Sequence, residues 1–472
     1  MVSADNLNFD VLELIFAFLA SKDLPNVALV SRSFNAAVLP QLYRVLPFRQ
    51  FHAKRHDVVM SPFAAVLAHP DLAIHVRQVD IQCIPLYKTG YPHPVFLRQC
   101  TQALALCTNL QTFRCSIPSF PSFILSLEDK PRLTTLRMHG SLTTCQVERL
   151  LRINTLVSLV VDTATWTILD ALPRWAESME DSLENLTIFM APDLNEGVLR
   201  STVLSLTRLR SLHVVGCQKI DHNALLNLTE HTPLLESLAL TATDSTCPLS
   251  TADHTLANLR HLAIDGRWHQ SSSNMLTVLN TIMDHINAAA PTLTSFVLRF
   301  HERSKTQLTL PLLKPILDAH KNTLRTLSFI ECTVGLDLVA HICNVCPIIQ
   351  RLEIGFPAMD PLGQVAFTSM IARSFSIRVL VDLNSHNHGP QSHKLTLSPE
   401  GVKNFMSNVR NLRTIITDGR VWTVSCDILA MRVELIILIG LQGQRIGGEM
   451  KVSFERQAVR QKTSSFWFMP RA

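Results

Sequence analysis

One short pattern recurs along most of this 472-residue chain: an apolar residue, two variable residues, an apolar residue, one variable residue and an apolar residue. A clear copy is Leu110, Phe113 and Cys115. Copies begin at Val76, Leu110, Leu133, Leu156, Leu183, Leu209, Leu235, Leu259, Leu293, Leu324, Ile349, Ile377 and Leu412. The steps between Leu110 and Leu412 average about 27 residues, a spacing typical of stacked strand-and-helix repeats.

Each copy predicts one short strand followed by one helix. The second half of the pattern alternates between apolar and variable residues, which indicates a strand with one buried face. Helical stripes lie between copies, for example Ala224, Leu225 and Leu228. A single strand and helix cannot bury their apolar sides until neighbouring units stack on them. We therefore expect an irregular α/β solenoid, with parallel strands on the concave side and helices on the convex side.

The best copy, Leu209 to Leu240, includes the run Leu-Arg-Ser-Leu-His-Val-Val-Gly-Cys. It resembles the cysteine-containing leucine-rich repeat of F-box proteins. The resemblance implies that Cys217 occupies a buried turn position. A second copy, Leu324 to Ile354, has Cys332 at the same place.

The first forty residues predict a separate helical module. Asn8 can cap a helix whose apolar residues recur at i, i+3, i+4 and i+7 from Leu12. Ser21 can cap a second helix, and Ser31 precedes a third that carries Phe34. Three short helices bury too little surface to fold well alone. We expect this module to pack against a partner.

Three motifs in this module resemble the F-box, the domain by which substrate receptors of cullin-RING ubiquitin ligases hold a Skp-type adaptor. They are Lys-Asp-Leu ending at Leu24, Val-Ser-Arg-Ser-Phe ending at Phe34, and Pro-Gln-Leu-Tyr-Arg ending at Arg44. Asn8 departs from the family, which usually has proline after the leucine at position 7. The resemblance implies adaptor contact by Leu7, Asn8, Leu12, Ile15, Leu24, Val30, Ser31, Arg32 and Phe34.

This resemblance implies a non-catalytic substrate-recognition subunit of a Skp/cullin/F-box ubiquitin ligase. Its partners would be the Skp-type adaptor, a cullin held through that adaptor, and a protein or peptide target on the solenoid. The expected organisation is an F-box at 1–46, a connecting region at 47–72, a solenoid at 73–420, and a cap or poorly ordered tail at 421–472. One alternative is a leucine-rich-repeat scaffold without a ligase; another is a hydrolase or metal protein.

The variable residues of each strand should face the concave side and meet a target. They are mostly small or hydroxylated and form no continuous basic band. Because nucleic acid requires many basic contacts, a protein or peptide is the better match. The candidate target contacts are Arg114, Arg137, His261, Arg299 and Arg351.

Composition constrains the class of protein and the compartment in which it is expected. Apolar residues make up 47% of the chain and charged residues 17%, which indicates a folded protein. The 11 cysteines form no disulfide framework, so reduced thiols in the cytoplasm or nucleus are expected. Asp5 and Asp10 argue against a signal peptide. The apolar run at Leu435 to Leu441 is too short for a membrane helix.

The sequence predicts no catalytic residue, metal or cofactor. Cys343 and Cys346 have the spacing of zinc ligands, but they lie on an apolar helical stripe, which favours buried structural cysteines. His386, His388 and His393 cluster in a predicted loop without a thiol or carboxylate to complete a site. The chain has no phosphate-binding glycine loop, HExxH motif or GxSxG motif.

Overall fold

The computed structural model of the chain comprises two compact units, Met1–Ile220 and Asp221–Ala472. We refer to them as unit 1 and unit 2 and describe each by itself. The structure describes residues 8–19, 23–56, 58–87, 90–245, 247, 249, 256–268, 272–290, 292–301, 306–356, 361–383, 399–417, 420–425, 451–455 and 467–470.

Unit 1 begins with three helices, α1 (Phe9–Phe16), α2 (Leu24–Ala28) and α3 (Arg32–Leu42). A parallel sheet follows, with strands β1 (Val45–Phe48), β2 (Gln78–Ile81), β3 (Thr112–Cys115), β4 (Thr135–His139), β5 (Ser158–Asp162), β6 (Asn185–Phe189) and β7 (Ser211–Val215) paired in chain order. The connecting helices are α4 (Gln50–Lys54), α5 (Pro62–Ala68), η2 (Pro70–His75), α6 (Pro94–Leu106), η3 (Phe120–Phe123), α7 (Ile124–Glu128), α8 (Thr144–Leu150), α9 (Trp166–Glu177) and α10 (Glu196–Leu204).

Unit 2 continues the same alternation. Its parallel strands are β8 (Ser237–Thr241), β9 (His261–Asp265), β10 (Ser295–Arg299), β12 (Thr326–Ile330), β14 (Arg351–Ile354), β15 (Val379–Asp382) and β16 (Thr414–Thr417). Its helices are α11 (His222–Leu228), η4 (Thr229–His231), α12 (Ser272–Ala289), α13 (Leu310–His320), α14 (Leu336–Val345), α15 (Pro361–Ile371) and α16 (Pro399–Asn408). A separate pair joins β11 (Gln307–Leu308) to β13 (Thr333–Val334).

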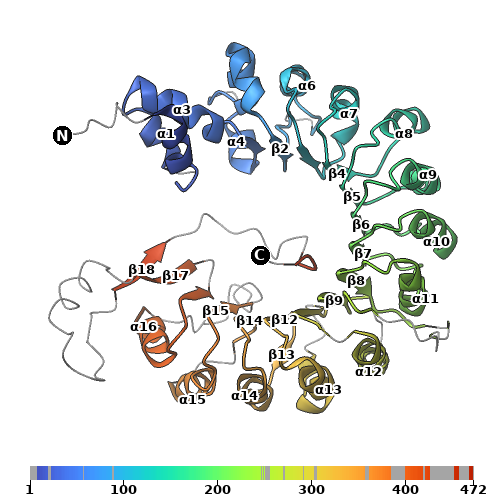
Figure 1. The fold of residues 1–472 in the computed structure, drawn as a ribbon, viewed down its shortest axis with the longest axis vertical. Coiled ribbons are helices and arrows are strands. Elements are labelled where there is room, and N and C mark those ends of the chain that lie inside the picture. The colour runs from blue at the N-terminus through green and yellow to red at the C-terminus, as the bar shows by residue number, and fades with distance from the viewer. Residues whose placement is uncertain are drawn as a thin grey trace. The chain divides into compact units, whose positions relative to one another are not determined.

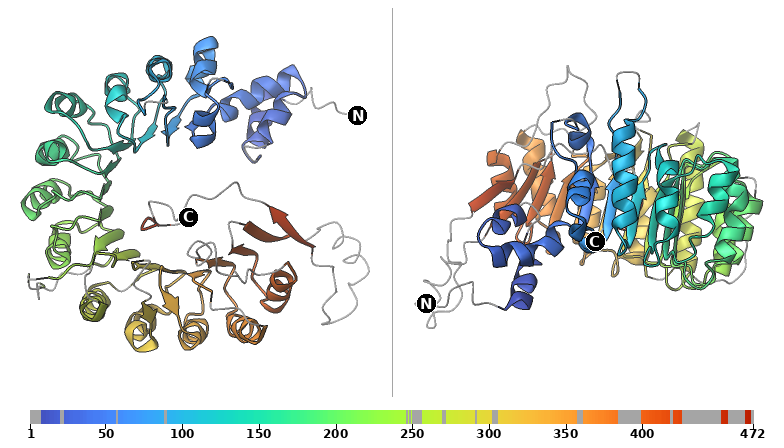
Figure 2. Two further views of the ribbon diagram at one scale, coloured as in Figure 1. Left: turned by 180° about the vertical axis from the view of Figure 1, so that it is seen from behind. Right: turned by 90° about the horizontal axis from the view of Figure 1, so that it is seen from above.

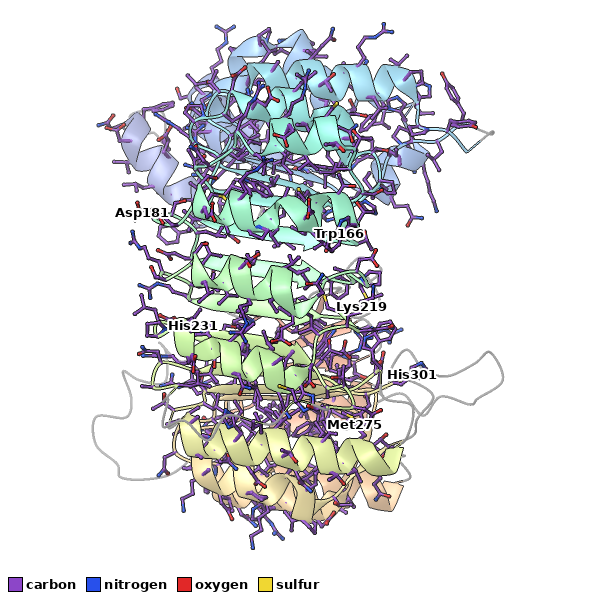
Figure 3. All side chains as sticks on the ribbon, turned by 90° about the vertical axis from the view of Figure 1, so that its right-hand side faces the viewer. Trp166, Asp181, Lys219, His231, Met275 and His301 are labelled. Carbon is purple, nitrogen blue, oxygen red and sulfur yellow. The ribbon has the colours of Figure 1, made fainter. Side chains whose placement is uncertain are left out.

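The repeat pattern predicts the strands correctly, and the α/β solenoid is confirmed. Every copy from Val76 to Leu412 begins two residues before a strand. Within unit 1, Leu136 pairs with Leu159, and Leu186 pairs with Leu212. These leucines are fully buried, so stacked copies share one apolar core. Within each unit the strands lie on one side and the helices on the other (Figures 1 and 2). Figure 3 shows the helical side, with Trp166 at the start of α9.

Tight turns follow several strands, and the first residue of each turn has a positive φ angle. Thr163, Met190 and Gly216 come directly after strands of unit 1 and have positive φ angles of 49°, 56° and 74°. Glycine adopts the positive φ of Gly216 without strain, whereas a side chain there would be strained and would also have to displace the Sδ atom of Met190. Cys217 follows it and is buried, as the repeat resemblance implies, and Cys332 of unit 2 is buried likewise.

Two segments differ from a simple reading of the sequence. The expected connecting region, 47–72, includes part of β1 and the helices α4 and α5, and it packs into unit 1 through Phe48, whose ring centroid lies 4.4 Å from that of Phe96. Within the expected cap or tail, β17 (Arg420–Ser425) pairs antiparallel with β16, and β18 (Lys451–Glu455) pairs antiparallel with β17. The sheet therefore changes from parallel to antiparallel pairing after β16.

None of the described helices combines the length and the apolar character that crossing a membrane requires.

Candidate functional site

The three N-terminal helices share a small core. It consists of Leu12 and Phe16 from α1, Leu24 from α2, and Ala37 and Val38 from α3. The ring of Phe34 packs on that of Phe16 with 5.2 Å between centroids. Ser31 caps α3 by accepting a hydrogen bond of 3.2 Å from the backbone N–H of Phe34. These contacts fix the angle between the helices.

A second set of apolar side chains points away from this core. Leu14, Phe18 and Val30 are 66%, 90% and 65% exposed. Phe9, Val11, Ile15, Leu19 and Leu29 are also exposed. We call these eight residues the apolar flank. Val11, Leu14, Ile15 and Phe18 recur at i, i+3, i+4 and i+7, the spacing of one helix face, and an exposed apolar face of this kind favours contact with another macromolecule. The expectation that the module leaves a docking surface open is therefore consistent with its geometry.

The predicted adaptor contacts divide into two groups. Asn8, Ile15, Val30 and Arg32 are exposed, while Ser31 and Phe34 are half-buried. Leu12 and Leu24 are only 2% and 5% exposed, because they fill the core of the three helices. The structure thus corrects their assignment from surface contacts to core residues. Leu7 lies outside the described residues.

In unit 1 the two candidate target contacts differ. Arg114 on β3 is exposed. Arg137 on β4 is tied to Asp162, with 2.8 Å between its Nε atom and a carboxylate oxygen. Burial raises the pKa of the Asp162 carboxyl, and the neighbouring Arg137 guanidinium opposes that rise. Arg137 is thus partly committed to an internal ion pair.

In unit 2 both candidate arginines are paired with carboxylates. Arg299 makes two hydrogen bonds to Glu331, of 3.1 and 2.9 Å. Arg351 donates to Glu353 over 2.6 Å, and Glu353, which also accepts a bond from Ser328, is fully buried. Since these charges are already balanced, an acidic target would gain little from them.

His261 is not an exposed contact, which corrects the sequence-based expectation. It is buried, and its Nε2 atom lies 2.6 Å from the backbone oxygen of Phe468. A carbonyl only accepts, so Nε2 carries the proton. Trp467, the neighbour of Phe468 in the chain, lies against Arg299, whose guanidinium carbon is 5.5 Å from the centroid of the Trp467 ring. The structure therefore brings two predicted candidates, His261 and Arg299, together around the C-terminal pair Trp467 and Phe468.

Sequence reasoning missed the partners of these candidates. Glu353 could have been found, because it stands two residues after Arg351 on the same strand and so shares its face. Asp162 and Glu331 lie at or after the ends of strands, where the repeat pattern gives no signal. The docking of Phe468 on His261 joins residues 207 positions apart, and no local pattern could indicate it.

Most cysteines of the repeats are buried thiols, whereas Cys145 on α8 is exposed. Burial raises the pKa of Cys217 and Cys343 to about 12 and that of Cys346 to about 11. Within the described residues, no three His, Cys, Asp or Glu side chains gather as metal ligands would. The loop histidines His386, His388 and His393 lie outside the described part of the chain.

Comparisons with known proteins agree with the N-terminal assignment. The family model of the F-box domain matches residues 5–41. No curated protein matches the sequence significantly. A solved structure of the Rad7 and Elc1 complex in yeast is similar over 82% of this chain and 91% of that chain, with 15% identity and a TM-score of 0.45. A structure of the TLR13–ssRNA13 complex is similar over 73% of this chain and 65% of that chain, with 14% identity and a TM-score of 0.24.

Both TM-scores are low, so the fold assignment depends on the strand and helix arrangement itself. The N-terminal assignment depends on the match at residues 5–41 and on the three-helix core described above. This chain therefore carries an F-box domain at residues 5–41, followed by an α/β solenoid of the leucine-rich-repeat type.

Proposed function

We propose that this chain is a substrate-recognition subunit of a Skp/cullin/F-box ubiquitin ligase. Its F-box domain holds a Skp-type adaptor, and through the adaptor a cullin, while the solenoid holds a protein or peptide target. The observation that carries the proposal is the apolar flank, which stays exposed although the three helices already have a core of their own. The partner would cover the flank, as interface cores cover clustered apolar anchors.

In this proposal the chain itself is not catalytic. The ligase partners transfer ubiquitin, and this chain contributes proximity and orientation of the bound target. The abundance of buried, unpaired thiols is consistent with a reducing compartment, so the cytoplasm or nucleus is the proposed location.

The test measures adaptor binding by the purified full-length chain. Leu14→Asp and Ile15→Asp change exposed flank residues of α1, so they should weaken adaptor binding at least tenfold, or about 1.4 kcal/mol, without lowering the melting temperature. The matched control is Leu125→Asp on α7, an exposed leucine of a repeat helix, and it should leave adaptor binding unchanged.

Two results would oppose the proposal. If no Skp-type adaptor binds the unmodified chain, the chain is a leucine-rich-repeat scaffold without a ligase link. If the adaptor binds but both flank variants bind equally well, the flank is not the docking surface.

A further inference from the structure

The face of unit 2 that a target would meet is already covered. Side chains at the variable positions of β8, β9, β10 and β12 should lie open on an empty strand face. Most of them are buried instead: Ser237, Ala239, His261, Ala263, Val297 and Ser328 are each at most 3% exposed, while Ser295 and Thr326 are half-buried. Burial of small and polar side chains on this face requires a covering layer.

Part of that cover is the C-terminal pair Trp467 and Phe468. Both side chains are buried, and their rings meet edge to face with 5.7 Å between centroids. The backbone oxygen of Phe468 accepts the hydrogen bond from His261, and the indole of Trp467 lies against Arg299. One backbone contact and one ring contact thus hold a short segment by features that any peptide with adjacent aromatic residues could supply.

The charges around this pair favour a neutral aromatic ligand. Arg299 is neutralised by Glu331, and Arg267 of the same unit is neutralised by the fully buried Asp265 over 2.7 and 2.9 Å. An arginine whose fork already binds a carboxylate can still present its flat face to a ring. It has little capacity left for a phosphate or an acidic side chain.

The bound segment also contains a buried hydrogen-bond donor that lacks an acceptor among the described residues. The Nε1–H group of Trp467 is buried, and among the described residues no acceptor lies within hydrogen-bond distance of it. A buried donor without a partner weakens binding. A ligand that supplies an acceptor, or that places the indole differently, would compete well with the chain's own segment.

We propose that the strand face formed by β9 and β10 is a binding surface for target segments with two adjacent aromatic residues. The chain's own Trp467 and Phe468 occupy it as a tethered competitor. This inference rests on the proposed function, since it gives the chemistry of the recruited target.

The test uses full-length protein and a fluorescent peptide with the sequence of residues 463–472. A double variant, Trp467→Ala with Phe468→Ala, opens the surface and should bind this peptide at least tenfold more tightly than the unmodified chain does. The difference arises because a tethered segment competes at a high effective concentration. A second peptide that keeps only the Trp-Phe pair between glycine and serine residues should bind the double variant within about tenfold of the first.

Further substitutions in the double variant locate the site. Arg299→Ala and His261→Ala should each weaken peptide binding about tenfold or more. Arg98→Ala, a substitution of an exposed arginine on α6 of unit 1, is the matched control and should have no effect. A peptide with alanine in place of both aromatic residues should not bind.

Equal peptide affinity for the folded double variant and the unmodified chain would overturn the inference, and so would equal binding after Arg299→Ala and Arg98→Ala. If the double variant does not fold, the unmodified chain is titrated with a photoreactive form of the peptide. Crosslinks to β9 or β10 then support the inference, and their absence at millimolar peptide contradicts it. Adaptor binding, measured in parallel, shows separately whether the proposed ligase role fails.

Discussion

At the scale of single residues, neighbouring positions in α1 have opposite roles. Leu12 is buried among the three helices, whereas Leu14 is 66% exposed. Two positions apart on a helix, side chains point to different sides. A leucine of the F-box is therefore a core residue or an exposed surface residue according to its place on the helix.

This difference predicts separate outcomes for two alanine substitutions. Leu12→Ala should lower the local free energy of unfolding by about 2–5 kcal/mol, the usual cost of a cavity in a core. Leu14→Ala should change it by less than about 0.5 kcal/mol. Amide hydrogen exchange of α1 to α3 in the full-length chain measures both values. Equal protection in the two variants would contradict the assignment of Leu12 to the core.

The sequence predicts single positions in this domain less well than it predicts helices. The stripe from Leu12 to Leu19 correctly indicates an amphipathic helix, but the small core accepts only Leu12 and Phe16 of that stripe. Ile15 and Leu19 remain exposed. Which apolar residues of a stripe stay outside depends on how α2 and α3 pack, and periodicity carries no information about that.

At the scale of elements, prediction succeeds where a local pattern repeats. Each strand in the parallel part of the sheet is marked by its own alternation, and copies stack in register because their apolar residues must share one core. β1 was not predicted, although Tyr43, Leu46 and Phe48 keep the repeat spacing; Pro47 stands at a variable position, where proline is tolerated because β1 is the first strand of the sheet. The contact of Trp467 with Arg299 follows no repeated pattern, so the sequence could not predict it.

The repeat cysteines predict a dependence of stability on pH. Burial raises the pKa of Cys115 and Cys217 to about 12, whereas the ordinary pKa of a thiol is 9.0. Between pH 9 and 12 the unfolded chain releases these protons while the folded chain keeps them, so stability falls as pH rises. Each thiol can contribute at most about 1.4 kcal/mol per pH unit.

Replacing Cys217 by alanine should therefore make the decline in stability above pH 9 less steep, whatever cavity cost it adds at pH 8. Cys145 is exposed, so Cys145→Ala is the matched control and should keep the parental slope. Thermal unfolding at several pH values from 8 to 10 measures the slopes. A parental slope in Cys217→Ala would mean that this thiol is not held protonated by burial.

At the scale of the whole molecule, a repeat chain should respond to damage locally. Each repeat is stabilised mainly by its immediate neighbours, so a defect weakens nearby repeats most. Phe329 on β12 is fully buried and meets Phe296 with 6.4 Å between ring centroids, so Phe329→Ala should cost about 3–5 kcal/mol in unit 2. Hydrogen exchange should rise in β10, β12 and β14, while protection of α1 to α3 and adaptor affinity remain within about twofold of the parent. Phe113→Ala, an equally buried phenylalanine of unit 1, should instead raise exchange in β2, β3 and β4. Uniform loss of protection along the chain in either variant would mean that the solenoid unfolds as one cooperative body, and target and adaptor binding would then be coupled through stability.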